Sequence, residues 1–323
     1  MGLKRSIKKF AWSLSPGLVY RLTSGGKTEF SIALYRGPTP FDLQPASDID
    51  RPILSRRHVT AAPAGTVADP FMVLAGDEWY LFFEFTNQFR GKGEIACATS
   101  ADLKTWRFRG LVLAEAYHLS YPQVFRWLDD YYMIPETGRS ESVRLYRARS
   151  FPDRWEHVTD LLTGQRFVDS SILRWDDRWW MFTDSGPDPE TPRLSLYHAA
   201  ELTGPWLEHP ASPLVTTDAR ISRPGGRMIV YDGRPCRFTQ NVDGVYGTEV
   251  RAFEIVVLDQ SSYEERPIGP DPVVGPGNEG WNRHGMHHVD AHRLADGTWM
   301  ACVDGCVRRD FDEELLPGGP LQS

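Results

Sequence analysis

The sequence lacks any long apolar run with the 3.6-residue period of a helix, and its 28 glycines and 24 prolines are spread along the chain. No glycine-rich phosphate-binding loop follows a strand pattern, so a nucleotide-binding α/β fold has no support. The four cysteines form no paired framework and no zinc-type spacing, which favours reduced thiols in a cytosolic protein. The net charge of -7 argues against a general nucleic-acid-binding protein, because such proteins present a basic face.

What the sequence does contain is a repeated, aromatic-rich strand that ends on a polar residue. The copies are Trp79–Glu84, Tyr131–Glu136, Trp179–Asp184, Pro235–Gln240 and Trp299–Asp304. Their last positions are separated by 52, 48, 56 and 64 residues. Spacings of this order are typical of β-propellers, in which each repeat forms one blade of about 40–50 residues. The repeat therefore predicts an all-β fold, a five-bladed β-propeller.

The third strand of the predicted blades indicates how the ring closes. Four copies are followed by such a strand, at Ile95–Ser100, Val143–Ala148, Leu194–Ala199 and Val250–Ile255. The fifth copy has none after it, but Phe30–Arg36 near the N-terminus resembles Val143–Arg147. We therefore expect N-terminal strands to complete the last blade, which removes the unpaired edges of an open array.

The predicted propeller covers residues 29–308 and is flanked by two segments of different composition. Residues 309–323 form an acidic tail with proline and glycine, and residues 1–28 begin with Lys4, Arg5, Lys8 and Lys9. The apolar stretch after these basic residues is too short and too interrupted to form a signal peptide or a transmembrane helix. Such a segment either lies on an anionic membrane surface or is a solvated tail. We expect a cytoplasmic protein, with peripheral contact at the inner membrane face as the further option.

Acidic residues recur at matching positions of the predicted blades. Inner strands carry Asp69, Tyr121 and Asp169, and the ends of the next strands carry Glu84, Glu136 and Asp184. Because inner strands of a propeller line one funnel, these side chains are expected to converge. Cleavage of a glycosidic bond needs one carboxylic acid and one carboxylate, and crowding of like charges separates their pKa values. The candidate catalytic residues are thus Asp69, Asp169, Glu136 and Glu84, with Tyr121 and Asp184 binding substrate; the alternative is that these carboxylates cap turns.

The fifth repeat contributes a histidine-rich strand. Alternation places His288, Asp290 and His292 on one face and His287 on the other. A single strand spaces such groups about 6–7 Å apart, too far for all three to share one small ion. His287, His288 and Asp290 are candidates for substrate binding, and His288 and His292 for a divalent cation near the propeller axis. No cofactor is required by the sequence.

The fourth repeat contributes arginines around a glycine pair. Arg223 and Arg227 flank Pro224–Gly226, and arginine forks bind carboxylates and phosphates in bidentate fashion. Surface salt bridges are the alternative use of these side chains. If they bind a ligand, the arginines predict an anionic sugar, a sugar phosphate or a phosphorylated glycolipid.

Several of these motifs resemble known families. Val67–Phe71, Leu119–Gln123, Tyr132–Glu136, Arg223–Arg227 and Met286–Asp290 resemble, in order, the N-terminal domain of plant glucosamine inositolphosphorylceramide transferases and its bacterial stand-alone relatives. The first blade also resembles the five-bladed propeller glycoside hydrolases of the arabinanase/xylosidase and invertase/levansucrase types.

The resemblance to the hydrolases implies roles for individual residues. It implies that Asp69 is the base or nucleophile, but Tyr121 stands where the hydrolases carry an aspartate, and Asp169 where they carry the glutamate acid. Asp169 is then expected to act as the acid, with Glu136 tuning it. In the plant proteins the glycosyltransferase signature lies in a separate C-terminal domain.

Two functions follow as hypotheses. The first is a carbohydrate-active enzyme of glycolipid or surface-polysaccharide metabolism that hydrolyses or transfers a glycosyl unit. The second is a non-catalytic glycan- or glycolipid-binding domain that partners a glycosyltransferase. A propeller that only binds proteins explains the residues less well, because it has no need to gather acids, arginines and histidines at inner positions.

Overall fold

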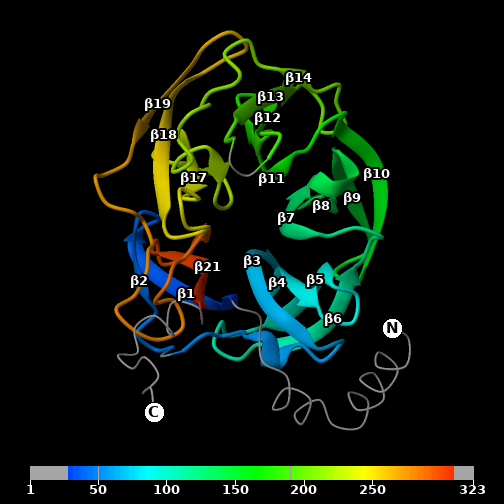
Figure 1. Cartoon of the computed structure of the whole chain (residues 1–323), viewed down its shortest axis with the longest axis vertical. Coiled ribbons are helices and arrows are strands. Elements are labelled where there is room, and N and C mark those ends of the chain that lie inside the picture. The colour runs from blue at the N-terminus through cyan, green and yellow to red at the C-terminus, as the bar shows by residue number, and fades with distance from the viewer. Residues whose placement is uncertain (1–27, 50, 189–190, 309–323) are drawn as a thin grey trace, which may run out of the picture.

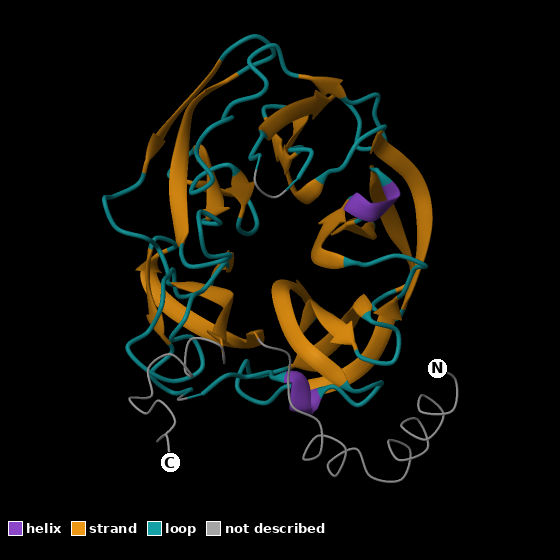
Figure 2. Ribbon diagram, in the orientation of Figure 1, coloured by secondary structure: helices purple, strands orange, loops and turns teal. Residues whose placement is uncertain are grey.

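The protein is a ring of antiparallel sheets, as Figure 1 shows. The computed structural model describes residues 28–49, 51–188 and 191–308. The sheets stand around one axis, and nearly all of the described secondary structure is strand (Figure 2). The prediction of a five-bladed β-propeller is confirmed. The basic segment expected to contact a membrane and the acidic tail lie outside the described residues, apart from Thr28.

The first four blades follow one another along the chain, each with its innermost strand first. Blade 1 contains β3 (Ala64–Ala75), β4 (Glu78–Asn87), β5 (Lys92–Ser100) and β6 (Arg107–Leu113). Blade 2 contains β7 (Ser120–Trp127), β8 (Asp130–Glu136), β9 (Ser142–Ser150) and β10 (Arg154–Thr163). Blade 3 contains β11 (Val168–Trp175), β12 (Arg178–Asp184), β13 (Leu194–Ala199) and β14 (Leu207–Glu208).

The last two blades complete the ring. Blade 4 contains β15 (Arg223–Pro224), β16 (Ile229–Tyr231), β17 (Arg234–Gln240), β18 (Val250–Leu258) and β19 (Tyr263–Pro267). Blade 5 contains β20 (His288–Arg293) and β21 (Trp299–Arg308), followed in the sheet by β1 (Thr28–Thr39) and β2 (Asp42–Pro45). Two 3-10 turns, Arg56–His58 and Gly138–Ser140, are the helical elements among the described residues. None of the described helices could span a membrane.

Strands from both ends of the chain close the ring, as the sequence predicts. β1 pairs antiparallel with β21 in an unbroken register from Thr28 opposite Arg308 to Gly37 opposite Trp299. The alternate residues Ile32 and Leu34 pack with Phe83 and Met300 in the core shared by blades 5 and 1. The same strand therefore supplies backbone pairing to one blade and apolar side chains to the next interface.

The inner strands of blades 1, 2 and 3 share a local distortion. Their pairing registers shift at the same place, between Ala68 and Phe71 in β3 and at the matching positions of β7 and β11. At these bulges Asp69, Tyr121 and Asp169 adopt positive φ angles of 53°, 46° and 51°. Residues other than glycine rarely adopt this conformation, so its repetition at three matching positions makes these bulges candidates for a functional site.

A cluster of aromatic rings from different blades packs beside these bulges. The Tyr121 ring packs edge-on against Phe71 at 4.9 Å and against His288 at 5.2 Å between centroids. The phenol of Tyr121 is fully buried and contacts Ser171 and Gly226. Tyr121, which the sequence predicts to bind substrate, therefore uses its hydroxyl to join blades.

Candidate functional site

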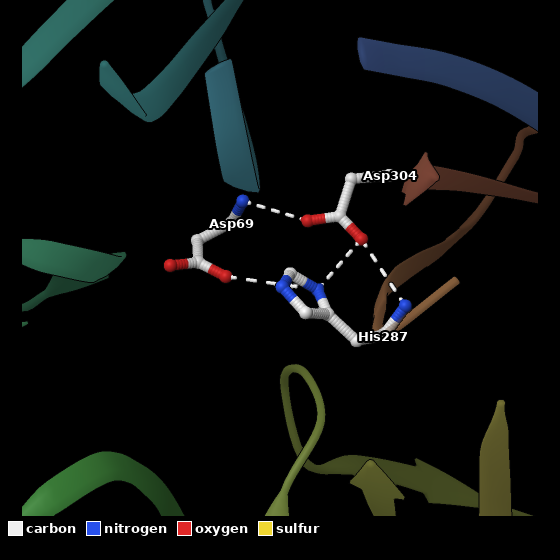
Figure 3. Close-up of side chains that lie close together, drawn as sticks. All are labelled: Asp69, His287 and Asp304. Atoms are coloured by element: carbon white, nitrogen blue, oxygen red, sulfur yellow. Dashed lines mark hydrogen bonds and ion pairs between the residues drawn. The ribbon is translucent and has the colours of Figure 1, made fainter. Parts of the chain in front are cut away.

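The first element of the candidate site is a buried trio, Asp69, His287 and Asp304 (Figure 3). The backbone N–H of Asp69 donates to Asp304 Oδ2 at 2.9 Å. His287 Nδ1 lies 2.8 Å from Asp304 Oδ1 and 3.9 Å from Asp69 Oδ1. The His287 ring is stacked on Phe30 of β1 at 4.4 Å, so the strand that closes the ring also fixes this imidazole.

The surroundings of the trio give its members different protonation behaviour. Burial, together with the charges of Asp169 and Asp304, raises the pKa of Asp69 to about 7, although His287 opposes the shift. Burial opposes protonation of His287, but Asp304 and Asp69 outweigh it and raise its pKa. Burial also opposes ionisation of Asp304, yet His287 outweighs it and lowers the pKa of that carboxyl. Asp69 is therefore able to hold or release a proton near neutral pH.

The same trio is the part of the site best suited to a metal ion. Among the described residues, it is the one group of three potential ligands whose donor atoms all lie within 4.8 Å of one another. Two carboxylates and one imidazole are ligands that several divalent metals accept. The trio contains neither His288 nor His292, which the sequence predicts as the metal ligands.

His288 and His292 instead contribute to packing between blades 5 and 1. His292 Nε2 lies 2.8 Å from Asp290 Oδ2, and its ring packs edge-on against Trp79. The buried ring of His288 packs against Phe71 at 4.6 Å between centroids, and burial lowers its pKa to about 4. The contact between His292 and Asp290 places these two side chains on one face of β20, as strand alternation predicts.

The second element of the site is Asp169, held by two donors from blade 4. Arg223 Nε donates to Asp169 Oδ2 at 2.5 Å, and Gln240 Nε2 donates to the same oxygen at 2.8 Å. The Asp169 side chain is 3% exposed and that of Arg223 is 14% exposed. A cationic donor and an amide donor from blade 4 therefore meet at one oxygen of Asp169.

The ends of the second strands contribute the remaining acids. Glu84 and Asp184 are buried and Glu136 is partly buried, and each pairs across from the residue that precedes a bulge. Burial, reinforced by the charges of Asp69 and Glu136, raises the pKa of Glu84 well above its usual range. Burial and the charge of Asp169 raise the pKa of Glu136, and burial raises that of Asp184.

Hydrogen bonds from nearby groups orient two of these acids. Glu136 accepts from Ser120 Oγ at 2.8 Å and from the Gly138 N–H at 2.6 Å. Asp184 accepts from the Gly186 N–H at 2.9 Å. The structure thus brings Asp69, Asp169, Glu84 and Glu136 into one region, since the charges of the other three act on Glu84. The charge of Arg223, the partner of Asp169, acts on Asp184.

Arg227 and Asp290, both predicted to bind substrate, form a structural brace. Arg227 Nε donates to Asp290 Oδ1 at 2.5 Å, and Arg227 Nη2 donates to the Met72 carbonyl at 3.1 Å. Asp290 Oδ2 accepts the Met72 N–H at 2.5 Å, and the Asp290 side chain is fully buried. This ion pair therefore ties blades 4 and 5 to the inner strand of blade 1.

Sequence reasoning missed four side chains at the site. Asp304 and Gln240 stand at the polar ends of the fifth and fourth repeats, so the repeat itself could have indicated them. His118 lies at the partly exposed edge, with Nε2 3.6 Å from Glu84 Oε1. Tyr246 lies on an irregular loop, and its ring packs edge-on against His287 at 5.2 Å. Neither His118 nor Tyr246 occupies a repeat position that would have marked it.

Fold and site together define a class: a five-bladed β-propeller built like those of glycoside hydrolases, with acids gathered at one end of its inner strands. The catalytic domain of a Coprinopsis cinerea α-L-arabinofuranosidase superposes with a TM-score of 0.56 at 12% identity, covering 87% of this chain and 98% of that one. A Bombyx mori β-fructofuranosidase gives a TM-score of 0.55 at 14% identity, covering 76% and 60%. At these identities the likeness shows the fold.

The chain belongs to the family described as glucosamine inositolphosphorylceramide transferase 1, N-terminal, whose model matches residues 23–306. Glucosamine inositolphosphorylceramide transferase 1 of Oryza sativa subsp. japonica is 34% identical over 301 residues, covering 87% of this chain and 40% of that protein. The Arabidopsis thaliana protein of the same name is 31% identical over 298 residues, covering 85% and 39%. The chain therefore spans about 40% of the length of these curated relatives.

Proposed function

We propose that this propeller is a carbohydrate-active enzyme that hydrolyses or transfers a glycosyl unit at its acidic cluster. The observation that carries the proposal is the contrast between Asp69 and Asp169. Both lie on matching bulges of inner strands, but Asp169 accepts from Arg223 and Gln240, whereas Asp69 is buried beside other acids. Acid–base cleavage of a glycosidic bond needs such a pair, one carboxyl carrying a proton and one ionised.

These surroundings favour a particular assignment of roles. Asp169, which accepts hydrogen bonds from Arg223 and Gln240, is the nucleophile or the base that activates water or an acceptor hydroxyl. Asp69, whose pKa burial raises to about 7, is the proton donor to the leaving oxygen. This reverses the roles that resemblance to the hydrolases implies. Burial and the nearby charges of Asp169 and Asp304 keep a proton on Asp69.

We further propose that the substrate is an anionic sugar or a phosphorylated glycolipid. Arg223 reaches the site from blade 4, and the charges of Arg166 and Arg223 act on Asp184 there. Cationic side chains at the edge of an acidic cluster suit a substrate with a phosphate or carboxylate near its glycosidic bond. The relatives are described as glucosamine inositolphosphorylceramide transferases, which agrees with this substrate class.

The second candidate function is glycan or glycolipid binding without catalysis, in partnership with a glycosyltransferase. Two observations favour it. Tyr121, which stands where the hydrolases carry an aspartate, buries its hydroxyl against Ser171 and Gly226. The chain also matches only about 40% of the length of the rice relative, so most of that protein lies outside the matched propeller.

One experiment separates the two candidates. Wild type, Asp69→Asn and Asp169→Asn are screened by thermal shift against nucleotide sugars, sugar phosphates and short anionic oligosaccharides, and consumption of each compound is measured. An enzyme predicts that wild type consumes a compound that stabilises all three proteins, and that both variants lose consumption. Binding by all three proteins without consumption would establish the accessory binding domain instead.

A further inference from the structure

Tyr246 is an exposed aromatic side chain at the edge of the acidic cluster. Its exposed fraction is 43%, and it is the one aromatic residue among the exposed large hydrophobic side chains of the described chain. Its ring lies edge-on to the buried His287, and the guanidinium carbon of Arg223 lies 5.1 Å from its ring centroid. Tyr246 is therefore exposed to solvent and also contacts His287 and Arg223. These two side chains contact Asp69 and Asp169, respectively.

The loop that carries Tyr246 is held in place by backbone contacts. The N–H groups of Gly247 and Thr248 both donate to the Asn241 carbonyl, at 2.9 and 3.2 Å. Arg308, at the end of β21, donates to the Tyr246 carbonyl. This loop connects β17 to β18, and its contacts with blade 5 fix the ring above His287.

Gly247 allows the close approach of this loop. Its φ is +69°, and a Cβ added there would lie 2.7 Å from His287 Cδ2. A side chain at this position would force the loop and the histidine apart. The geometry thus requires glycine beside the exposed tyrosine.

We propose that Tyr246 is the platform on which a pyranose ring packs while its anionic substituent contacts Arg223. This inference rests on the proposed function, because it deepens the substrate class of the same site. An aromatic ring offers an apolar face to the C–H groups of a sugar, and its hydroxyl remains able to bind a sugar hydroxyl. The guanidinium beside it provides the charge for a phosphate or carboxylate.

The test compares three probes by isothermal titration: α-D-glucose 1-phosphate, D-glucose and inorganic phosphate. Tyr246→Ala should weaken binding of glucose 1-phosphate about three- to tenfold, the range that an aromatic contact contributes. Tyr246→Phe should keep affinity within about twofold, because the ring face remains. Gly247→Ala should act like Tyr246→Ala, and Leu128→Ala, at an exposed hairpin turn, is the control.

Inorganic phosphate is the decisive comparison, because it lacks the ring. The platform predicts that Tyr246→Ala leaves phosphate binding unchanged. Equal weakening of phosphate and glucose 1-phosphate, unchanged binding of glucose 1-phosphate, or no preference of wild type for glucose 1-phosphate over phosphate would each overturn it. Loss of consumption in Asp69→Asn would still support the enzyme in those cases. Binding that depends on Tyr246 but is not followed by consumption would support the sugar-binding role of Tyr246 and contradict the proposed catalytic function.

Discussion

The phenol oxygen of Tyr121 in blade 2 lies 2.6 Å from the backbone nitrogen of Gly226 in blade 4 and 2.9 Å from the carbonyl oxygen of the same residue. Ser171 Oγ lies 2.7 Å from the same phenol oxygen. One hydroxyl thus joins blades 2, 3 and 4. Gly226 also forms an isolated bridge to Val289 of blade 5, and a Cβ on Gly226 would lie 1.8 Å from the Val289 carbonyl oxygen. A tyrosine in place of the hydrolases' aspartate thus stabilises the centre of the ring.

Replacing Tyr121 with phenylalanine should therefore destabilise the fold. The change removes the hydroxyl and leaves the buried Gly226 N–H without its partner, which costs about 1–3 kcal/mol. Urea denaturation of wild type and Tyr121→Phe measures this difference. Tyr131→Phe is the matched control, because the structure gives the Tyr131 ring a stacking contact with Phe151 and its hydroxyl no hydrogen bond among the described residues. Equal midpoints for all three proteins would show that the hydroxyl does not hold the blades together.

Arg223 should be needed for both stability and turnover. Arg223→Gln leaves Asp169, whose side chain is 3% exposed, without its cation, and such a change costs about 3–5 kcal/mol. Adding Asp169→Asn should recover much of this loss, because no buried charge then remains. The double-mutant cycle is measured by denaturation, and turnover is measured for each protein. Arg220→Gln, in the exposed pair with Asp218, should change neither quantity; additive effects at Arg223 and Asp169 would contradict the pairing.

The Arg227–Asp290 brace should protect the fold against acid. Burial opposes ionisation of Asp290, but Arg227 and His292 outweigh it and hold the pKa of this carboxyl well below its usual range. A lowered pKa stabilises the fold above the unfolded value of about 4, and the stabilisation is lost as pH falls further. Arg227→Met should therefore move the acid-unfolding midpoint, followed by circular dichroism, to higher pH. An unchanged midpoint would contradict the stabilising role of the Arg227–Asp290 pair and would favour the substrate-binding role that the sequence predicts for both residues.

Much of the fold could be predicted because it depends on periodic features. The repeat copies that end at Glu84 and Asp304 share a pattern of apolar residues and a turn. This pattern sufficed to predict β4 and β21, although both strands continue beyond those residues, to Asn87 and Arg308. The likeness of Phe30–Arg36 to a third strand sufficed to predict closure of the ring. The region of Asp69 and Asp169 followed from the same repeat, since equivalent positions of a propeller meet at one axis.

The partners of those acids could not be predicted, because they depend on contacts between blades. Nothing in the repeat indicates that Tyr121 bonds to Gly226, or that His287 rather than His288 faces Asp69. The loop at Tyr246 is irregular, so no periodicity places its ring. Sequence spacing predicts the direction of a side chain on its own strand. Whether that side chain is free for catalysis or is used in packing depends on the residues that the neighbouring blade places against it.

Asp69→Asn should stabilise the fold at pH 8 while abolishing turnover. Asparagine tolerates the positive φ of this position. Burial raises the pKa of Asp69 to about 7, above the unfolded value of about 4, so the folded state binds this proton more tightly. Wild type therefore loses stability as pH rises from about 4 through 7, and removing the charge should return about 4 kcal/mol at pH 8 and less than half of that at pH 5.

Thermal unfolding of wild type and Asp69→Asn at the two pH values measures this effect. Asp177→Asn, at a fully exposed turn carboxyl, is the control for removing one negative charge. A variant that is more stable at pH 8 yet inactive would mean that the strained, buried acid at position 69 lowers stability but is needed for the reaction. A variant that is less stable at pH 8 would mean that Asp69 acts as the anionic partner of His287, and the proton donor would then have to be sought at Glu84 or Glu136.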